Sequence, residues 1–584
     1  MTTDRSPDPV NGEEYEAKKT VTGDSIQKSV LKWLNALSSR KTAKYAVYIS
    51  ALILFFMLVL LPPVFGIIVK WNAIPAVLNQ PDLEGKALNA IGNSFWIALL
   101  VSALDLIAGI PMAWLITRGK SRWLSVLDTL ADIPFIVPTA ALGYSLLLFW
   151  YKPEGISSLF GASPLISPGW LLIMLLHFTF SYPVVVRVLV GALLDYKMEY
   201  ERASRTLGAV PFVAFRTVTS PIIKPSLIAA FVLSFARSLS ETGATFIVAG
   251  LFENGPVFLQ NLKNEYSNGL VTQTTYEGAT VFASLILIVA SCAIFALIWI
   301  LGPRLKFPFK GVWPGAERKL SYSKAATSRN GVTLAVFLGL VLIPALFVAL
   351  PAFQAVFTPV LPAALSGSGI WSNYWQSLLL SYLLGATVTI LGLIMGLPMA
   401  VLIARRKLGK TPSAAMDILV NIPLIVPSIA LGASLSFFWR QSFPFMPDII
   451  LLIFAHLSIT YPYIVKSMSA AFERISLDME EAARTLGAKP FTVFSTIVLP
   501  LTKYSILSGA IMVFTRSVSE TGATVAVLSP NSPFETAPVV LVNWVKGAVS
   551  ATPLEIGLGA GLLVLLSFVI LFALRLVTRG KGRT

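Results

Sequence analysis

Two repeated stretches place an arginine and a glutamate four residues apart inside long apolar segments. The first is RSLSETGAT, with Arg237 and Glu241, and the second is RSVSETGAT, with Arg516 and Glu520. Positions i and i+4 of a helix share one face, so each pair could form an ion pair along its helix. A charge inside a membrane span is costly unless it is paired or hydrated, and such residues usually face an interface or an aqueous path. We predict a gate built from these residues; the alternative is a salt bridge that only holds helices in register.

A glycine follows two residues after each of these glutamates, at Gly243 and Gly522. Glycine lets helices approach closely and can act as a hinge. We therefore include both glycines in the predicted gate.

A polar motif is also repeated, as ERASRTLGAVPF at 201–212 and as EEAARTLGAKPF at 480–491. In the second copy, acidic and small residues favour a short helix, Gly487 interrupts it, and Pro490 can begin a second helix. Such a helix–glycine–helix unit could lie in a groove of another protein. The alternative is a duplicated elbow that has no partner.

Pairs of prolines form a third repeated feature, again inside apolar segments. They are Pro134 and Pro138, repeated as Pro423 and Pro427. Two prolines four residues apart remove backbone donors from one helix face, so we predict a kink in each helix. The kink could line a pathway or could be structural only.

Other polar residues in the apolar segments are isolated. His177 and His456 have no acidic or thiol neighbour in sequence, so we predict hydrogen-bonded histidines rather than metal ligands or proton relays. Asp105 has no counterpart in the second half and is predicted to be a helix-packing group. The single cysteine, Cys292, excludes an intrachain disulfide and a thiolate metal cluster. We predict no metal site.

The elements that must hold these residues are membrane spans. Of the 584 residues, 55% are hydrophobic and only 13% are charged, whereas a soluble domain has about 25% charged residues. Several apolar blocks exceed the roughly 18 residues that indicate a membrane-spanning helix. The pattern predicts an all-α integral membrane protein with about twelve transmembrane helices. The spans lie near 46–69, 91–117, 128–150, 169–193, 225–251, 276–301, 332–357, 375–404, 414–439, 447–470, 503–529 and 554–577.

Basic residues predict the orientation, because segments on the cytoplasmic side retain Lys and Arg. With the N-terminus inside, the tails and even-numbered loops hold 37 of the 45 basic residues, and two more lie within spans. The remaining six fall in odd-numbered, external loops: Lys70, Lys86, Lys152, Lys263, Arg440 and Lys546. Both termini are therefore predicted to be cytoplasmic, in a prokaryotic plasma (inner) membrane. The net charge of +16 reflects this topology facing anionic lipid and requires no nucleic acid.

The chain is a duplication of one six-span unit. The motifs at Arg237 and Arg516 are offset by 279 residues, and the same offset relates the two histidines. Six is an even number, so the two halves must be parallel repeats, with the pathway expected between them. The predicted regions are a cytosolic tail 1–45, a first permease domain 46–301, a cytosolic linker 302–331, a second permease domain 332–577 and a basic cytosolic tail 578–584. Within the first tail, Ile26, Val30, Leu34 and Leu37 could form an interfacial helix beside Lys28 and Lys32, or the tail could be disordered.

The second polar motif resembles the EAA loop of binding-protein-dependent ABC importer permeases, which has the form E-A-A-x-x-x-G-x9-I-x-L-P. Its residues here are Glu481, Ala482, Ala483, Gly487, Ile497, Leu499 and Pro500. The first copy departs from the form: Arg202 stands at the Glu position after Glu201, Ala203 is kept, Ser204 replaces the second Ala, and Gly208 is kept. The stretch 218–221 replaces I-x-L-P. The resemblance implies two loops that couple the chain to ATP-hydrolysing subunits.

The gate motif and the paired prolines resemble permeases for molybdate, sulfate, iron(III) and thiamine, except that Thr242 and Thr521 stand where many of those have Phe. The resemblance, which extends from residue 46 onward, implies a type I importer fold with both transmembrane domains fused. It implies two ABC ATPase subunits that hold ATP and magnesium, and an extracytoplasmic solute-binding protein. The chain itself is expected to carry no cofactor and no enzymatic activity. Iron(III) is the first expectation for the substrate, and thiamine, molybdate or tungstate, sulfate and phosphonate are alternatives.

Two other classes of function compete with this interpretation. An ion-coupled secondary transporter would also use parallel repeats and would couple through Glu241 and Glu520, but it has no use for two docking loops. A membrane-embedded enzyme would need an acid–base or metal constellation, and none is visible. The stretches Gly119–Ser121 and Gly409–Thr411 mimic the end of a P-loop but lack its first glycine.

Overall fold

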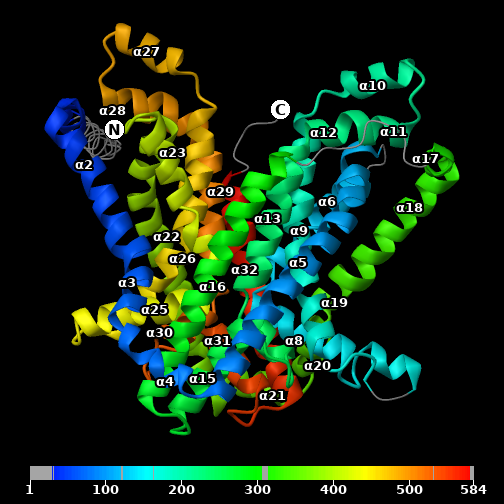
Figure 1. The fold of residues 1–584 in the computed structure, drawn as a ribbon, viewed down its shortest axis with the longest axis vertical. Coiled ribbons are helices and arrows are strands. Elements are labelled where there is room, and N and C mark those ends of the chain that lie inside the picture. The colour runs from blue at the N-terminus through cyan, green and yellow to red at the C-terminus, as the bar shows by residue number, and fades with distance from the viewer. Residues whose placement is uncertain are drawn as a thin grey trace, which may run out of the picture. The chain divides into compact units, whose positions relative to one another are not determined.

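The computed structural model describes residues 29, 32–119, 123–161, 164–304, 314–530 and 532–578. These residues form helices and connecting turns, with no strand among them (Figure 1). Part of the predicted interfacial helix (Ile26, Lys28 and Val30), residues 305–313 of the linker, Lys120 and Ser121 of the P-loop mimic, and the basic tail from 579 lie outside the described residues.

Contacts divide the chain into two compact units. The smaller unit comprises Met1–Phe55, Leu393–Asp417 and Tyr463–Ala510. The larger unit comprises Phe56–Gly392, Ile418–Pro462 and Ile511–Thr584. Each is described below by itself.

The elements follow the predicted duplication. In the first half they are α2 (Lys41–Leu54), η1 (Phe55–Leu60), α3 (Leu61–Val69), η2 (Trp71–Ala73), α4 (Pro75–Leu78), α5 (Pro81–Arg118), α6 (Trp123–Leu130), α7 (Ile133–Ile136), α8 (Thr139–Trp150), η3 (Ile156–Phe160), α9 (Trp170–Asp195), α10 (Met198–Thr206), α11 (Pro211–Ala214), η4 (Phe215–Thr219), α12 (Ser220–Ile222), α13 (Lys224–Ser240), α14 (Gly243–Val248), α15 (Gly255–Ser267), α16 (Gln273–Leu301) and η5 (Gly302–Arg304). In the second half they are α17 (Pro314–Leu320), α18 (Ser323–Val336), η6 (Phe337–Leu342), α19 (Ile343–Leu346), α20 (Ala349–Val356), α21 (Val360–Ser366), α22 (Ile370–Ala404), α23 (Lys410–Leu419), α24 (Ile422–Ile425), α25 (Ser428–Ser442), α26 (Asp448–Glu473), α27 (Leu477–Thr485), α28 (Pro490–Val493), η7 (Phe494–Val498), α29 (Leu499–Val518), α30 (Gly522–Val527), α31 (Ala537–Val545) and α32 (Pro553–Thr578).

The described residues contain nine to eleven candidate membrane-spanning helices, against about twelve predicted. Nine helices of the described chain are long and apolar enough to cross a membrane. Counting each of two bent helix pairs as one span gives up to eleven: Pro211–Ile222 with Lys224–Ser240 at 75°, and Lys410–Ile425 with Ser428–Ser442 at 104°. The shorter apolar helix Thr139–Trp150 occupies the third position of the first half. The fold is therefore the predicted all-α membrane protein built from two six-span repeats.

The third span of each half is broken at the second proline of its pair. In the second half, α24 ends at Ile425 and α25 begins after Pro427, with Val426 extended at ψ 132°. In the first half, Val137 is likewise extended at ψ 121° before Pro138. The residue before a proline is pushed out of the helical region, which explains the break at these positions. The interruption is a sharp bend rather than a mild kink.

Within the larger unit, the first span of the first half packs against the second half. A Cβ built on Gly66 of α3 would lie 1.7 Å from the carbonyl oxygen of Ser434 in α25, so only glycine fits there. Nearby, the hydroxyl of Ser458 donates to the carbonyl of Val59 over 2.9 Å.

The first span of the second half packs in the same way against the first half. The hydroxyl of Ser145 in α8 donates to the carbonyl of Pro344 over 2.7 Å and accepts from the amide of Val348 over 2.8 Å. Thr179 donates to the carbonyl of Leu340 over 2.9 Å. The carbonyls of Leu340 and of Val59 belong to π-helical turns, whose wider backbone pairing often marks functional positions. The two halves thus exchange their first spans.

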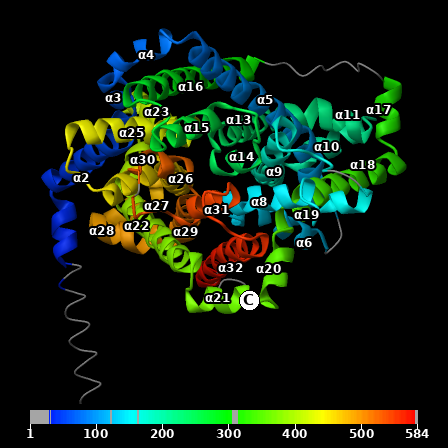
Figure 2. The same cartoon turned by 90° about the horizontal axis from the view of Figure 1, so that it is seen from below.

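The short helices α8, α14 and α31 lie side by side within the larger unit (Figure 2). Every residue of α8 is buried. These helices are the framework for the site described below.

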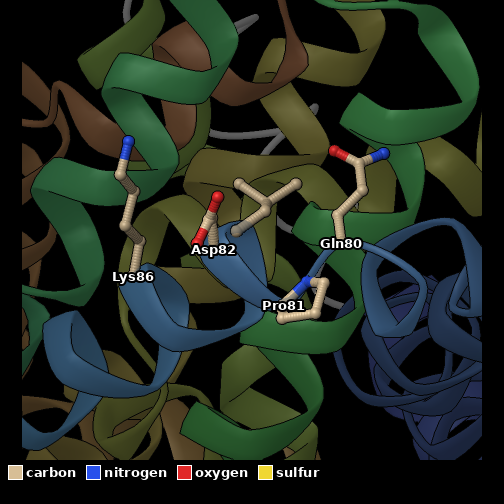
Figure 3. Close-up of a pocket in the computed structure, with 5 residues that line it drawn as sticks. Gln80, Pro81, Asp82 and Lys86 are labelled. Carbon is tan, nitrogen blue, oxygen red and sulfur yellow. The ribbon is translucent and has the colours of Figure 1, made fainter.

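A surface depression lies at the start of α5 (Figure 3) and is lined by Gln80, Pro81, Asp82, Leu83 and Lys86. Most of these residues are exposed, and the negative charge of Asp82 is offset by the positive charge of Lys86. A ligand site normally buries a few convergent polar groups, so this depression is not the candidate site.

Candidate functional site

The two predicted gate motifs lie at interruptions of the fifth spans. The helix α13 ends at Ser240, Glu241 is extended at φ −79° and ψ 129°, and α14 begins at Gly243. In the second half α29 ends at Val518, before Glu520. Each glutamate therefore lies just beyond the end of its helix, although Arg516 and Glu520 still form the predicted i,i+4 ion pair.

The two glutamates cap the short helices that follow them. An Oε1 atom of Glu241 accepts from the amide of Ala244 over 3.2 Å, and that of Glu520 accepts from the amide of Ala523 over 3.0 Å. Both side chains are almost fully buried, at 6% and 2% exposure. A carboxylate at a helix N-terminus satisfies amides that otherwise lack partners. This capping explains why a glutamate occupies the interruption.

The two motifs contact each other directly within the larger unit. A Cβ built on Gly243 would lie 1.9 Å from Oγ1 of Thr521, and a Cβ built on Gly522 would lie 2.5 Å from Oγ1 of Thr242. Real Cβ atoms do not approach so closely, and any side chain here would separate the two motifs. The predicted role of the glycines in close packing thus has a specific partner in the opposite half.

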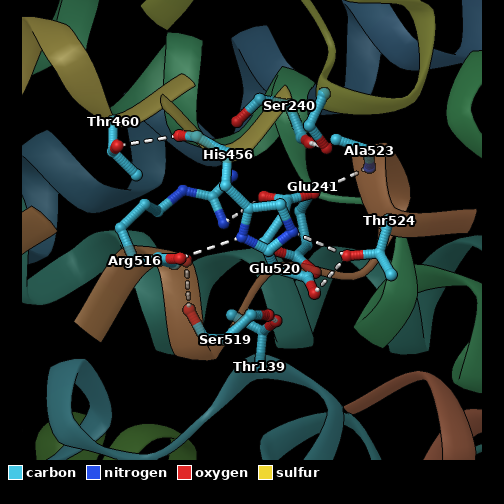
Figure 4. Close-up of polar contacts among 12 residues, drawn as sticks. Thr139, Ser240, Glu241, His456, Thr460, Arg516, Ser519, Glu520, Ala523 and Thr524 are labelled. Atoms are coloured by element: carbon cyan, nitrogen blue, oxygen red, sulfur yellow. Dashed lines mark hydrogen bonds and ion pairs between the residues drawn. The ribbon is translucent and has the colours of Figure 1, made fainter. Parts of the chain in front are cut away.

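A reciprocal pair of hydrogen bonds surrounds this contact (Figure 4). The hydroxyl of Thr139 donates to the carbonyl of Ser519 over 3.2 Å, and the hydroxyl of Ser428 donates to the carbonyl of Ser240 over 3.2 Å. Both donors come directly after the proline at the broken third span. Sequence reasoning missed them, although the signal is present: each follows the second proline of its pair.

The same third spans approach the gate helices through glycine. A Cβ on Gly143 would lie 2.9 Å from Cα of Ala244, and one on Gly432 would lie 2.8 Å from Cα of Ala523. Because the obstructing atoms are backbone, neither position can accept a side chain without moving a helix. The broken third and fifth spans are therefore packed as one layer.

The arginines of the two motifs have different partners. Arg516 pairs with Glu520 in the same motif, with 2.6 Å between Nη1 and Oε2 (Figure 4). Arg237 donates from Nε to the carbonyl of Phe180 over 3.1 Å, and its guanidinium lies 5.4 Å from the centre of that ring. Glu241 also interacts electrostatically with Arg516 of the opposite motif. The charges of the two motifs thus interact across the contact.

The two histidines brace this layer. His456 contacts the hydroxyls of Ser517 and Thr524 at 2.9 Å each, and His177 contacts those of Ser238 and Thr245 at 2.8 Å each. Each imidazole joins the helix before the interruption to the one after it. This agrees with the prediction of hydrogen-bonded histidines. Within the described residues, no group of three or more His, Cys, Asp and Glu side chains is placed to hold a metal ion.

Asp105 joins three helices of the first half. Its Oδ2 accepts from the hydroxyl of Ser234 over 2.6 Å and from that of Ser181. The carboxyl is fully buried. The arrangement is that of the predicted packing group, linking α5, α9 and α13.

The first predicted docking loop lies in the larger unit as α10 and α11, and the second lies in the smaller unit as α27 and α28. Gly208 and Gly487 separate the two helices of each loop at φ +93° and +86°, a region that favours glycine. A leucine precedes each glycine, and both leucines are almost fully exposed, Leu207 at 89% and Leu486 at 90%. Both loops thus present an exposed leucine at equivalent positions.

The acidic residues of these loops are held differently. Glu480 pairs with Arg405 in the smaller unit, at 2.5 Å between Oε1 and Nη2. Glu201 stands at the equivalent position of the first loop and is 4% exposed. Its Oε2 has no hydrogen-bond partner among the described residues. The equivalent arginine, Arg118, lies 5.5 Å and 5.7 Å from the rings of Trp114 and Tyr196.

The remaining predicted loop residues are largely accessible. Glu481 and Ala482 are exposed, and Ala483 is half-exposed. Ala203 is exposed, and Pro500 begins the fifth span of the second half within α29. These positions of the E-A-A motif are thus largely exposed on the surface of the loops.

Comparison with known proteins agrees with this architecture. The family model described as "Binding-protein-dependent transport system inner membrane component" matches twice, at residues 105–307 and 392–579. The sulfate transport system permease protein CysT of Salmonella typhimurium is 32% identical over 223 residues, which are 37% of this chain and 79% of that protein. The permease CysW of Escherichia coli K12 is 31% identical over 225 residues, 36% of this chain and 74% of that protein. A probable sulfate permease cysT of Nephroselmis olivacea is 29% identical over 292 residues, 49% of this chain and 97% of that protein.

Each of these relatives therefore corresponds to less than half of the chain, as a fused duplication requires. The family model covers more than half of the residues and matches once in each half. Members of this family are transport components, and ATP is hydrolysed by separate subunits. The chain belongs to the binding-protein-dependent transport system inner membrane components, the permeases of ABC importers.

Proposed function

We propose that this permease imports sulfate or a closely related tetrahedral oxyanion. The similar proteins named above are sulfate permeases, and sulfate was among the substrates that the gate motif suggested. Iron(III), the first expectation from the sequence, gains no support from these relatives. Thiamine and phosphonate gain none either.

The gate is the contact between the two SETGAT motifs. The single observation that carries this proposal is the pair of contacts between Gly243 and Thr521 and between Gly522 and Thr242. Any solute that passes between the halves at this level must separate them. The two hydroxyl–carbonyl bonds from the third spans would break at the same time. The gate would close again when these contacts re-form. Each of them is weak, so the gate could open and close in every transport cycle.

The charges of the gate suit an anionic solute. Two buried carboxylates would repel sulfate, but each is bonded to backbone amides, and Arg516 pairs with Glu520. Two arginines therefore offset two glutamates at this level. Opening the gate would expose guanidinium groups, which bind oxyanions with directed hydrogen bonds.

The two loops that carry Leu207 and Leu486 are proposed to dock two ABC ATPase subunits on the cytosolic side. Burying a leucine contributes about 1.5–3 kcal/mol, and both leucines are available at the loop tips. The orientation with both termini cytoplasmic remains part of the proposal and comes from the basic residues. Solute would reach the opposite side on a separate binding protein, and ATP with magnesium would be held by the partner subunits.

The proposal is tested in proteoliposomes that contain the chain, its ATPase subunits and its binding protein. We expect ATP-dependent uptake of labelled sulfate, and competition by molybdate would show how strictly the oxyanion is selected. The variants Gly487→Ala and Glu481→Ala should reduce ATPase assembly or stimulated hydrolysis. Uptake of iron(III) but not sulfate would refute the substrate assignment while leaving the permease assignment intact.

An ion-coupled carrier is the second candidate. It would move solute down an ion gradient without an ATPase and would depend on Glu241 and Glu520. Membership of the importer family disfavours it, and gradient-driven uptake without ATP would revive it.

A further inference from the structure

The second helix of each docking loop begins without a cap of its own. Its first residues are Pro211 and Phe212 in α11, and Pro490 and Phe491 in α28. The residue before each helix makes no side-chain cap. Amides in the first turn of a helix have no partner within the helix, so a donor is left at each phenylalanine.

A serine from another part of the chain accepts each of these donors. In the larger unit the amide of Phe212 donates to the hydroxyl of Ser321 over 3.2 Å. In the smaller unit the amide of Phe491 donates to the hydroxyl of Ser38, also over 3.2 Å. Phe212 and Phe491 are equivalent residues of the two halves. The same contact therefore occurs in both halves.

Each serine is oriented as an acceptor by its own helix. The hydroxyl of Ser321 donates its proton to the carbonyl of Glu317 over 2.8 Å, and that of Ser38 donates to the carbonyl of Asn35 over 3.1 Å. A hydroxyl has one proton, so its remaining lone pairs face the docking helix.

Both serines belong to segments that lead directly into a first span. Ser38 lies in the last turn of the helical segment 32–39, which precedes the span beginning at Lys41. Ser321 follows α17 and precedes the span beginning at Ser323. We call segments 32–39 and 314–321 the capping segments. The first spans are those that the two halves exchange, so each capping segment caps the docking loop of the half against which its span packs.

A further contact holds each capping segment to its loop. In the smaller unit the amide and the hydroxyl of Thr492 both donate to Oδ1 of Asn35, over 3.1 Å and 3.0 Å. In the larger unit Glu317 pairs with Arg216, with 3.1 Å between Oε1 and Nε, and both side chains are at least 85% buried. One half uses hydrogen bonds and the other an ion pair, but in both a side chain of the capping segment contacts the loop region.

We propose that the capping segments are positioning elements of the coupling machinery, which move with the docking loops and carry their displacement into the exchanged first spans. This inference rests on the proposed docking of ATPase subunits at these loops. ATP-driven movement of one loop would then reach the gate by two routes: along its own fifth span, and through the first span of the other half.

The test uses the complete transporter in proteoliposomes, with labelled sulfate as the probe. Ser38→Ala and Ser321→Ala should leave ATPase assembly unchanged and lower the sulfate imported per ATP hydrolysed by about three- to tenfold. Ser39→Ala and Thr327→Ala are the matched controls, because each removes an exposed hydroxyl that bonds only its own helix. An unchanged import per ATP in both test variants would overturn the proposal.

Disulfide trapping gives a readout that does not depend on activity. In a Cys292→Ser background, the pairs Asn35→Cys with Thr492→Cys and Glu317→Cys with Arg216→Cys should cross-link under mild oxidation and still transport. The pair Trp33→Cys with Thr492→Cys should not cross-link, because the exposed position 33 lies on another side of the helical segment from position 35. Transport that stops on cross-linking would show that segment and loop must separate, and the proposal would fail. If the unmodified transporter binds no ATPase subunit, the proposed function fails instead.

Discussion

The arginines of the two halves use different partners at two separate places. In the second half Arg516 and Arg405 each pair with a glutamate, at 2.6 Å and 2.5 Å. In the first half Arg237 and Arg118 lie against aromatic rings. The ring positions explain the difference: Phe180, Trp114 and Tyr196 are replaced in the second half by Ile459, Val401 and Ile475. The duplicated motif alone does not set the partner of a charge; the residues packed around it do.

The contacts that surround the gate and cap the docking loops, by contrast, are the same in both halves. The glycine–threonine contacts, the hydroxyl–carbonyl bonds and the serine caps of the docking loops all occur twice. Symmetry is thus retained in these contacts and is lost in the pairing of charges.

The largest effect is expected from the ion pair of the gate. Glu520→Gln leaves Arg516 buried without its carboxylate partner, and breaking a buried pair costs about 3–5 kcal/mol. Glu241→Gln should cost less, because Arg237 keeps its contacts with Phe180. Thermal unfolding in detergent, followed by tryptophan fluorescence, would compare the two. Equal losses would show that the halves use their charges alike.

Alanine at the gate glycines should separate the motifs. At Gly243 the new Cβ would meet Oγ1, Cβ and Cγ2 of Thr521, all within 2.8 Å, and overpacking costs about 1–3 kcal/mol. Gly522→Ala should be somewhat milder, since its nearest contact, with Oγ1 of Thr242, would be 2.5 Å rather than 1.9 Å. Sulfate uptake and passive leak of the vesicles measure closure. Gly191→Ala is the control, because nothing lies within 4 Å of that position.

The docking loops can be compared through their leucines. Leu486→Ser and Leu207→Ser should each weaken ATPase binding by about tenfold or more, since a buried leucine contributes about 1.5–3 kcal/mol. The intact E-A-A motif of the second half predicts the larger loss for Leu486→Ser. Leu270→Ser is a useful control: it is also exposed, at 75%, but is predicted to lie on the external side. Weaker ATPase binding in that control would contradict the orientation.

The main pH dependence above pH 8 should come from Lys263 in the first half. Burial lowers the pKa of Lys263 to about 8, and the aligned position in the second half is Val545. Below pH 8 the folded chain bears the cost of a buried ammonium, and between about pH 8 and 10.5 it binds fewer protons than the unfolded chain. Stability should therefore rise across that window, by about 1–2 kcal/mol after allowance for partial exposure. Lys263→Met should reduce the rise and leave the contribution of Lys546, whose pKa is also lowered by burial.

The smallest effect is expected from exchanging the aromatic partner. Phe180→Ile gives the first half the residue of the second, and loss of a cation–π contact costs about 0.5–1 kcal/mol. The converse change, Ile459→Phe, offers Arg516 the same alternative. If the packed residues set the partner, the cost of Glu241→Gln should grow when it is combined with Phe180→Ile. An additive double variant would argue against this explanation.

The elements and the duplication could be predicted from the sequence, because apolar blocks and repeated motifs are local signals. The twelve span positions, the helix–glycine–helix loops and the hydrogen-bonded histidines were predicted from such signals. The interruption of the fifth span before Glu241 was not, since the i,i+4 spacing of Arg and Glu fits a continuous helix equally well. The capping role of that carboxylate became evident only when the backbone position of Ala244 was known.

Contacts between distant segments could not be predicted without an alignment. Nothing near Gly66 or Ser145 indicates that the first spans pack against the opposite half. The serine caps were hidden for the same reason: Ser38 and Ser321 lie in segments that read as a tail and a linker. Their role depends on Phe491 and Phe212, which are remote in sequence.

The exchanged first spans have a consequence for synthesis. The hydroxyl that bonds Val59 belongs to Ser458, 399 residues further along the chain. At about 5–20 residues per second, a ribosome needs roughly 20–80 s to make that partner. Until then the carbonyl of Val59 lacks the hydroxyl that it bonds in the finished protein. Fusion of the two halves ensures that the partner arrives on the same polypeptide, so assembly does not depend on the concentration of a second subunit.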